Sequence, residues 1–381
     1  MEVTDTSLDK SISTAKIRNS NLELYRIIVM MLIVLHHYVV NSGLYQILEN
    51  APFSYQSVTM IILGGWGKIG INCFVLITGY FMCKSKFSFI KLLKLYTQII
   101  FYTLIIYSIF CITGHEHFQL LKMFSLLFPI HGITDSFVGC FLVFYLLIPF
   151  INILINNLNK KQHLIIISIL LVFYSILPSI PKFYITFNYV EWFVVIYLIS
   201  SYIRNYPPPP QKVSWLSHKI WGWFTIALIM IDSCSIIGLE YLRYIGILDK
   251  FIPYHFIIDS NKILAVLTAV SSFMFFKDLR IPYSRFINTI GAATFGVLLI
   301  HANSDAMRQW LWRETVDCIG HYGSSFVWTI GYAIITSIII FFICAGIDWF
   351  RSNYIEPHYM KYFSRKFQRI KFIQDNSNDR K

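Results

Sequence analysis

Ten apolar stretches separated by short polar segments limit most strongly how this chain of 381 residues can fold. A helix needs about 20 mostly apolar residues to cross roughly 30 Å of hydrocarbon. With soft boundaries, the candidate stretches are residues 22–41, 62–82, 95–113, 136–155, 163–180, 188–203, 220–238, 260–276, 286–303 and 324–346. We therefore predict an all-α polytopic membrane bundle with about ten transmembrane helices.

The composition agrees with a membrane protein and argues against several other classes. Charged residues make up only 14% of the chain and hydrophobic residues 56%, whereas a soluble domain carries about 25% charged residues. Basic cytoplasmic loops explain the net charge of +12, and because no nucleic-acid-binding motif occurs, we expect no nucleic-acid partner. The seven cysteines are scattered without a CxxC pair, so we predict neither a metal site nor a disulfide framework.

The distribution of Lys and Arg predicts how the bundle is oriented. With the N-terminus in the cytoplasm, 24 of the 32 Lys and Arg residues fall on the inner side, as the positive-inside rule favours. We expect both termini to be cytoplasmic and the chain to be a multi-pass protein of the inner cell membrane. It then comprises a cytoplasmic N-terminal tail (1–21), a membrane domain (22–346) and a basic cytoplasmic tail (347–381) suited to anionic membrane lipid.

The first apolar stretch carries ionisable residues on one helical face. Arg26 and His37 are eleven positions apart, which places them roughly 20° apart around a helix and about 16.5 Å apart along it. They share a face but cannot touch, whereas His36 lies about 100° away from its neighbour and has a supporting role at most. Glu23 precedes Arg26 by three residues, within ion-pair reach. Anchoring and packing would explain each residue alone, but ionisable groups sharing an interior face indicate a functional site.

A cluster of glycines surrounds a lysine in the second stretch. Gly64, Gly65, Gly67 and Gly70 lie around Lys68 without the Gly-Lys-Ser/Thr ending that a phosphate-binding loop requires. Small residues in a membrane helix allow neighbouring helices to approach closely. We therefore expect this segment to serve helix packing or to break the second helix.

Four stretches, taken in order, resemble segments of the membrane acyltransferase 3 family. They are LELYRIIVMMLIVLHHY (22–38), GKIGINCFVLITGYF (67–81), FSFIKLLKLY (87–96) and GAATFGVLLIH (291–301). The chain departs from the family pattern in having Thr78 for Ser, a Lys91–Lys94 pair for an Arg pair, and Leu298 for Tyr. The Trp that often precedes the YLLxPF segment is missing from DSFVGCFLVFYLLIPF.

The resemblance implies an integral-membrane O-acyltransferase. Such an enzyme moves an acetyl group from cytoplasmic acetyl-CoA to a hydroxyl of a cell-surface polysaccharide or its lipid-linked precursor. It implies catalytic roles for His37, Arg26 and Glu23, with His37 taking the proton from the acceptor hydroxyl. Arg26, Lys91 and Lys94 would bind the CoA phosphates, although a lysine offers only a point charge where an arginine binds in a bidentate manner. Lys91 and Lys94 also satisfy the positive-inside rule without any ligand.

Three residues expected on the outer side are candidates for acceptor binding, and alternatives that need no acceptor stay open. His301 follows an apolar run and either packs, helps bind acceptor or supports His37. Glu191 is either an interfacial residue or a group that orients His37 and contacts sugar hydroxyls. Asp305 follows His301 by four residues and is placed to pair with it.

Two other classes of function compete with an acyltransferase. A transporter or flippase for a lipid-linked sugar would use intramembrane charges as a conduit, but the related halves of an inverted-repeat transporter are not evident in the sequence. A polysaccharide polymerase would be expected to have a large, charge-rich outer loop, which the chain lacks.

Overall fold

The computed structural model describes residues 19–130, 136–183, 185, 188–207, 215–248 and 251–363, without the side chains of residues 215–218. Residues 1–18 of the predicted N-terminal tail and 364–381 of the predicted C-terminal tail lie outside the described residues.

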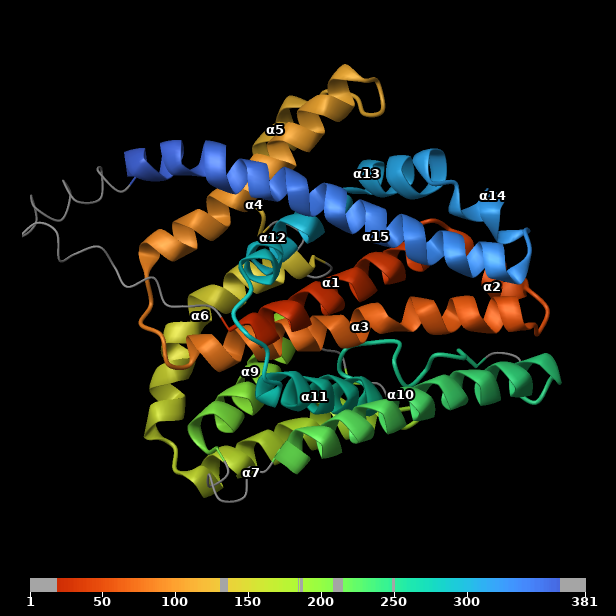
Figure 1. Ribbon diagram of the computed structural model, residues 1–381, viewed down its shortest axis with the longest axis horizontal. Coiled ribbons are helices and arrows are strands. Elements are labelled where there is room, and N and C mark those ends of the chain that lie inside the picture. The colour runs from red at the N-terminus through yellow and green to blue at the C-terminus, as the bar shows by residue number, and fades with distance from the viewer. Residues whose placement is uncertain are drawn as a thin grey trace, which may run out of the picture.

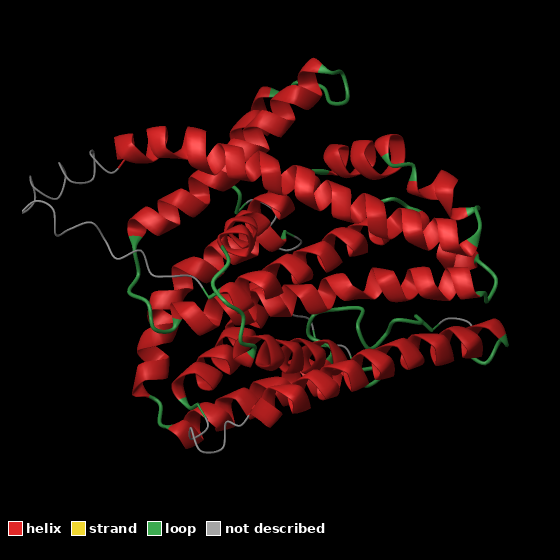
Figure 2. Cartoon of the chain, in the orientation of Figure 1, coloured by secondary structure: helices red, strands yellow, loops and turns green. Residues whose placement is uncertain are grey.

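Helices joined by short loops and turns account for the described part of the chain, which contains no strand (Figure 2). The main helices are α1 (Ser20–Val40), α3 (Tyr55–Met82), α4 (Phe89–Ile112), α6 (Phe137–Asn157), α7 (Lys160–Leu171), α9 (Tyr189–Asn205), α10 (Trp215–Tyr244), α11 (Ile263–Asp278), α12 (Arg285–His301) and α15 (Phe326–Phe350). The short ones are α2 (Leu44–Asn50), α5 (Leu120–Leu126), α8 (Leu177–Ser179), α13 (Asp305–Gln309) and α14 (Cys318–Tyr322), with π-helical turns at Val172–Ile176, Trp310–Thr315 and Arg351–Ile355. The prediction of an all-α chain is confirmed.

In the part of the chain that the structure describes, fewer helices than the ten predicted stretches are long and apolar enough to cross a membrane. Within the described residues, seven helices are long and apolar enough to cross a membrane, or eight if α12 and the following helix, bent by 96°, form one broken span. Each of the ten predicted stretches falls on a helix, but α9 has 17 residues and α11 has 16. Both are shorter than the usual transmembrane length. The chain is a multi-pass membrane protein, and the count of about ten stays a prediction.

Helix α1 occupies the middle of the bundle, where it packs against α3, α11, α12 and α15 (Figure 1). Glycines on α3 make its closest contacts possible. In steps of three residues, Gly64 lies against Val39, Gly67 against His36 and Gly70 against Ile33. Because the numbering rises along one helix and falls along the other, α1 and α3 run antiparallel in a fixed register. A Cβ atom on Gly67 would lie 2.2 Å from the His36 ring, so the expected role of these glycines in helix packing is confirmed.

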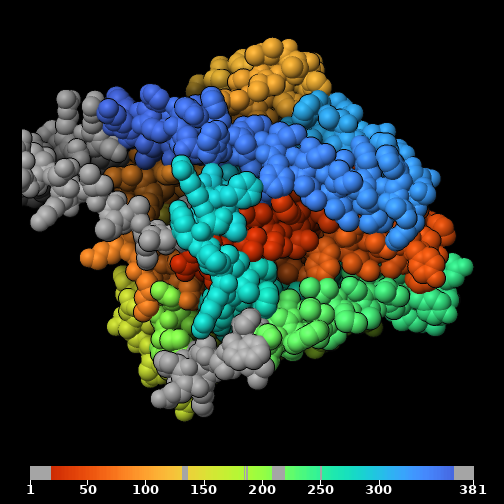
Figure 3. All heavy atoms as spheres, viewed as in Figure 1, coloured from red at the N-terminus to blue at the C-terminus, as the bar shows by residue number. Residues whose placement is uncertain are grey.

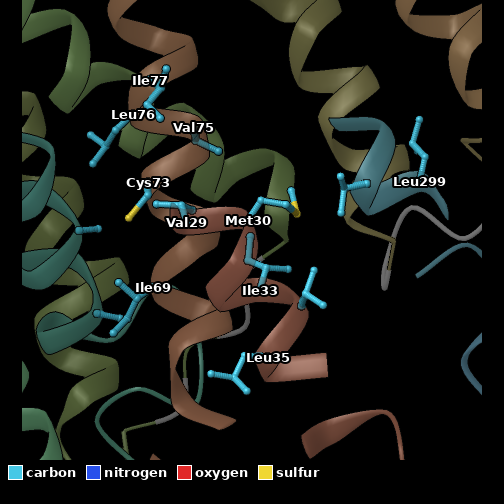
Figure 4. Close-up of a cluster of buried hydrophobic side chains, with 14 of the residues drawn as sticks. Val29, Met30, Ile33, Leu35, Ile69, Cys73, Val75, Leu76, Ile77 and Leu299 are labelled. Carbon is cyan, nitrogen blue, oxygen red and sulfur yellow. The ribbon is translucent and has the colours of Figure 1, made fainter. Parts of the chain in front are cut away.

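Apolar side chains fill the contact between α1 and its neighbours (Figure 4). Those labelled there are Val29, Met30, Ile33 and Leu35 of α1, Ile69, Cys73, Val75, Leu76 and Ile77 of α3, and Leu299 of α12. The outer helices instead turn large apolar residues outward, as Ile335 and Ile339 of α15 do. Figure 3 shows α10 and α15 on the visible surface, with parts of α1 and α3 visible between them. This apolar exterior is what a lipid environment requires.

Contacts at the helix ends show that α1 begins where α15 ends. Gln56, at the start of α3, donates to Thr329, at the start of α15, over 3.2 Å. Since α3 is antiparallel to α1, so is α15. The loops that carry Lys84 and Arg280 and the start of α7 at Lys160 meet at this same end, which we call the basic end. The prediction that both termini face the cytoplasm is compatible with this arrangement but is not tested by it.

A network of buried charges joins α15 to α4 near the basic end. Arg351 lies 2.8 Å from Asp348 and 2.8 Å from Glu356, and all three residues are buried. Gln98 and Tyr102 of α4 donate to the same Asp348 oxygen over 3.1 and 2.8 Å. Lys94 of α4 forms an ion pair with Glu356, and Arg351 also donates to Tyr359. We call these seven residues the Asp348 network.

The helical conformation continues past the predicted end of the membrane domain. The segment from Phe326 to Phe363 is a single run of 38 residues, so the boundary drawn at residue 346 falls inside it. The buried Asp348 network holds the first part of the predicted tail against the bundle.

Candidate active site

Two histidines from distant parts of the sequence meet at the end of α1 opposite the basic end. His37 Nδ1 lies 2.9 Å from Nε2 of His301, the last residue of α12. The other nitrogen of His301, Nδ1, lies 2.5 Å from the carbonyl oxygen of Val297. His301 is fully buried, whereas His37 is half-buried. The two histidines therefore form a hydrogen-bonded chain from the buried carbonyl of Val297 through His301 to the partly accessible ring of His37.

The hydrogen-bond pattern fixes which nitrogen of each neutral ring carries the proton. A carbonyl oxygen can only accept, so His301 Nδ1 carries a hydrogen and donates it to Val297. His301 Nε2 then holds a lone pair and accepts from the Nδ1–H of His37. The lone pair of His37 is left on Nε2, the nitrogen that a general base needs. His301 therefore contacts His37 directly, as one of the roles that the sequence left open would require.

His37 lines a cavity of about 670 Å³ in this half of the bundle. Its wall is formed by residues of α1, α3, α4, α5, α6, α9, α12 and α13 and of adjoining loops. The ionisable residues in the wall are His36, His37, Lys68, Glu116, Lys122, Tyr189, Asp305 and Arg308. A volume of this size is within the range that accommodates a small-molecule substrate. His37 therefore borders a space large enough for a substrate.

Lys68 and Arg308 bring positive charge to the cavity beside His37, and both interact electrostatically with its ring. Lys68 Nζ donates to the Tyr189 hydroxyl over 2.9 Å and lies 3.6 Å from a carboxylate oxygen of Asp259. Arg308 lies 2.8 Å from a carboxylate oxygen of Asp305, whose side chain is 96% exposed. Sequence reasoning missed both cations as site residues. The available signal was that Lys68 is a charge inside an apolar stretch.

His36 anchors α1 to α3 and is separate from the His37–His301 pair. Its Nδ1 bonds to the Gly64 carbonyl, and its ring packs on Gly67. The His36 and His37 ring centroids are 5.3 Å apart. These contacts are consistent with the supporting role expected for His36, since they fix the register of α1 against α3 next to His37.

Arg26 and Glu23 form the expected ion pair on α1, with a separation of 3.2 Å. Glu23 is only 4% exposed and packs closely on α12, where a Cβ atom at Gly291 would lie 2.5 Å from its carboxylate. Arg26 is nearer the basic end and does not line the cavity that contains His37. The Arg26–Glu23 pair and His37 therefore both lie on α1 as predicted, but the pair and the histidine belong to different parts of the bundle.

The remaining predicted site residues have different surroundings. Lys91 is exposed, whereas Lys94 is engaged by Glu356 in the Asp348 network. Asp305 lines the cavity and pairs with Arg308 rather than with His301. Glu191 is exposed on α9 and is not part of the cavity wall. His37, which Glu191 was considered to orient, is bonded through its Nδ1 to His301.

Comparison with known proteins gives one match. A family model described as an acyltransferase domain matches residues 19–349. The matched region runs from the start of α1 almost to the end of α15 and includes His37, His301 and the cavity wall. No curated protein and no solved structure matches the chain.

Proposed function

Because the chain belongs to the acyltransferase 3 family, we propose that this membrane acyltransferase is an O-acetyltransferase of the inner cell membrane. Acetyl-CoA in the cytoplasm is the donor, and a hydroxyl of a cell-surface polysaccharide or its lipid-linked precursor is the acceptor. One observation carries the proposal beyond the family. The lone pair of His37 is held on Nε2 by the bond to His301, beside a cavity of about 670 Å³.

The reaction follows from this arrangement by general base catalysis. The acceptor hydroxyl gives its proton to His37 Nε2 while its oxygen attacks the thioester carbon. The tetrahedral intermediate then collapses, the carbon–sulfur bond breaks, and the CoA thiolate takes the proton back from His37. The products are an acetyl ester and free CoA. His301 is a positioning residue, because its bond to Nδ1 holds the His37 ring in the productive tautomer.

Donor binding is assigned to the basic end of the bundle. Arg26 lies about 16.5 Å from His37 along α1, a distance comparable to the reach of the pantetheine arm. The phosphates of CoA would then lie near Arg26 and Lys91, with the thioester threaded toward the cavity. Lys94 contributes less than the sequence suggested, since Glu356 already neutralises it.

Acceptor binding is assigned to the cavity wall. Asp305 is the expected acceptor residue that lies there, and its carboxylate can accept from a sugar hydroxyl. The rings of Phe137 and Tyr189 also line the cavity and offer apolar faces to a sugar ring. Glu191, exposed outside the cavity, has no role in this proposal.

The decisive experiment supplies purified protein with radiolabelled acetyl-CoA and candidate lipid-linked glycans. Label on a sugar hydroxyl that depends on the thioester supports an enzyme, whereas glycan translocation without label supports the rival transporter. His37→Ala should abolish labelling without loss of folded protein. His358→Ala, at an exposed position outside the cavity, is the matched control and should retain it. Normal acetylation by the His37 variant would remove His37 as the base.

A further inference from the structure

We propose that Lys68 is a catalytic residue that stabilises the oxyanion formed on the thioester carbonyl during acyl transfer. The assignment rests on the proposed function, because only an acyl transfer generates this charge. Attack by the acceptor hydroxyl moves the carbonyl π electrons onto oxygen, and the negative charge appears within bonding distance of the attacked carbon. Fixed positive groups at that point are usually the largest single contribution to catalysis.

The contact between α1 and α3 puts Lys68 near the base. Gly67 lies directly against His36, so the next residue on α3 is level with the His36–His37 pair. Lys68 and His37 line the same cavity, and both histidines interact electrostatically with Lys68. A carbonyl carbon attacked by a hydroxyl that is bonded to His37 would therefore have the ammonium group close by.

Two neighbours hold the ammonium group of Lys68 in place. The Tyr189 hydroxyl accepts from Nζ at 2.9 Å, and Asp259 lies 3.6 Å away. An ammonium group has three N–H donors, so one remains for a ligand in the cavity. The Lys68 side chain is 29% exposed, which means that water screens its charge only in part. The group is thus oriented before substrate arrives, as an oxyanion site requires.

Arg308 is the other cation near His37, but it is less suited to this role. It lies on α13, a helix of five residues, and its partner Asp305 is almost fully exposed. Lys68 lies on α3, a helix of 28 residues that packs against α1 and α9. Groups on rigid elements hold reacting geometry better than groups on short surface segments. The geometry therefore favours Lys68.

The chemical step balances without any further reactant. The acceptor oxygen forms a bond to the carbonyl carbon, its proton passes to His37, and the displaced electron pair rests on the carbonyl oxygen opposite Lys68. When the pair returns, the carbon–sulfur bond breaks and the proton moves from His37 to the thiolate. Lys68 remains protonated throughout, because it contributes charge and a hydrogen bond rather than a proton.

The test compares Lys68→Gln, Lys68→Arg and Tyr189→Phe with the unmodified protein in the acetylation assay. Loss of one oxyanion donor lowers kcat by about 10²- to 10³-fold, so we expect at least a 10²-fold fall for Lys68→Gln, with KM for both substrates nearly unchanged. Lys68→Arg keeps the charge and should lose less. Tyr189→Phe keeps Lys68 but removes the hydroxyl that holds its ammonium group, so a smaller fall in kcat is expected. This variant keeps the proposal testable even if Lys68→Gln folds poorly.

Two outcomes would overturn the assignment, and a third would reject the function on which it rests. Full kcat in folded Lys68→Gln would show that no oxyanion contact exists. A rise confined to the acceptor KM would make Lys68 an acceptor-binding group instead. Absence of any acetyl transfer by the unmodified protein would reject the proposed function itself. Loss of activity in His37→Ala together with full activity in Lys68→Gln would reject only the role of Lys68.

Discussion

Two groups of polar residues inside the bundle differ in whether their hydrogen-bonding groups and charges are all paired within the protein. In the Asp348 network, Arg351 is shared by Asp348 and Glu356, and Lys94 reaches the same Glu356. Around His37, by contrast, the bond to His301 leaves the Nε2 lone pair unused, and His37 and Lys68 both line a cavity of about 670 Å³. The network satisfies its charges internally, whereas the candidate site keeps reactive atoms available.

The difference shows why a buried charge does not by itself mark an active site. Taking ions out of water is costly, and the cost is offset only when partners surround them. The Asp348 network meets that condition and joins α4, α15 and the following helix. Chemistry needs a group whose partners hold it without using its last donor or lone pair. Substitutions should therefore affect stability in one region and catalytic rate in the other.

The largest effect on stability is expected for Arg351→Met. It leaves Asp348 and Glu356 buried without their cation, and breaking a buried pair in this way costs about 3–5 kcal/mol. Arg280→Met, at an exposed position of the basic end, should change stability by no more than about 0.5 kcal/mol. Thermal unfolding in detergent measures both. A wild-type melting temperature for Arg351→Met would mean that the network is not a structural clamp.

A large effect on rate without a matching loss of stability is also expected at His301, which touches His37 but not the cavity. His301→Leu removes the acceptor for His37 Nδ1, so kcat should fall by about 10²-fold, the lower end of what general base catalysis contributes. His301→Gln retains an acceptor oxygen and should recover part of that loss. Equal kcat values for the Leu and Gln variants would indicate packing rather than tautomer control.

The sequence predicted the local features of α1 well. The helical period placed Glu23, Arg26 and His37 correctly on α1, and the pair of Glu23 with Arg26 is confirmed at 3.2 Å. The glycines around Lys68 indicated close packing by the second helix, and the structure identifies the partner as α1. These inferences succeed because they concern residues within a few helical turns, where the backbone geometry determines which side chains share a face and can be in contact.

Contacts between distant helices could not be predicted in the same way. His37 and His301 are 264 positions apart, and Lys68 and Tyr189 are 121 apart. Periodicity gives each helix a face, but the order in which faces meet depends on packing of the whole bundle. Glu356 illustrates the same limit, since a residue in a predicted cytoplasmic tail is buried by pairing with Arg351.

The third prediction concerns the glycine contact that sets the register of the site. Gly67→Ala places a Cβ atom 2.2 Å from the His36 ring, and overpacking of this kind costs about 1–3 kcal/mol. Because His37 is the next residue, kcat should fall as well. Gly331→Ala on α15, with no atom within 4 Å of the new Cβ, should leave stability and rate at or above wild type. Unaltered stability in Gly67→Ala would show that α1 and α3 are not held in this register.

The smallest effects are expected from the two lysines one turn apart on α4. They distinguish a residue that contributes to stability from a residue that binds the donor. Lys94 is 53% exposed and paired with Glu356, so Lys94→Gln should lower stability by about 1 kcal/mol or less. Lys91 is exposed and has no side-chain partner among the described residues, so Lys91→Gln should instead raise the apparent KM for acetyl-CoA. Donor titrations of both variants at constant acceptor concentration measure the difference. A larger rise in KM for Lys94→Gln than for Lys91→Gln would place the donor phosphates over the Asp348 network, and part of that network would then belong to the active site.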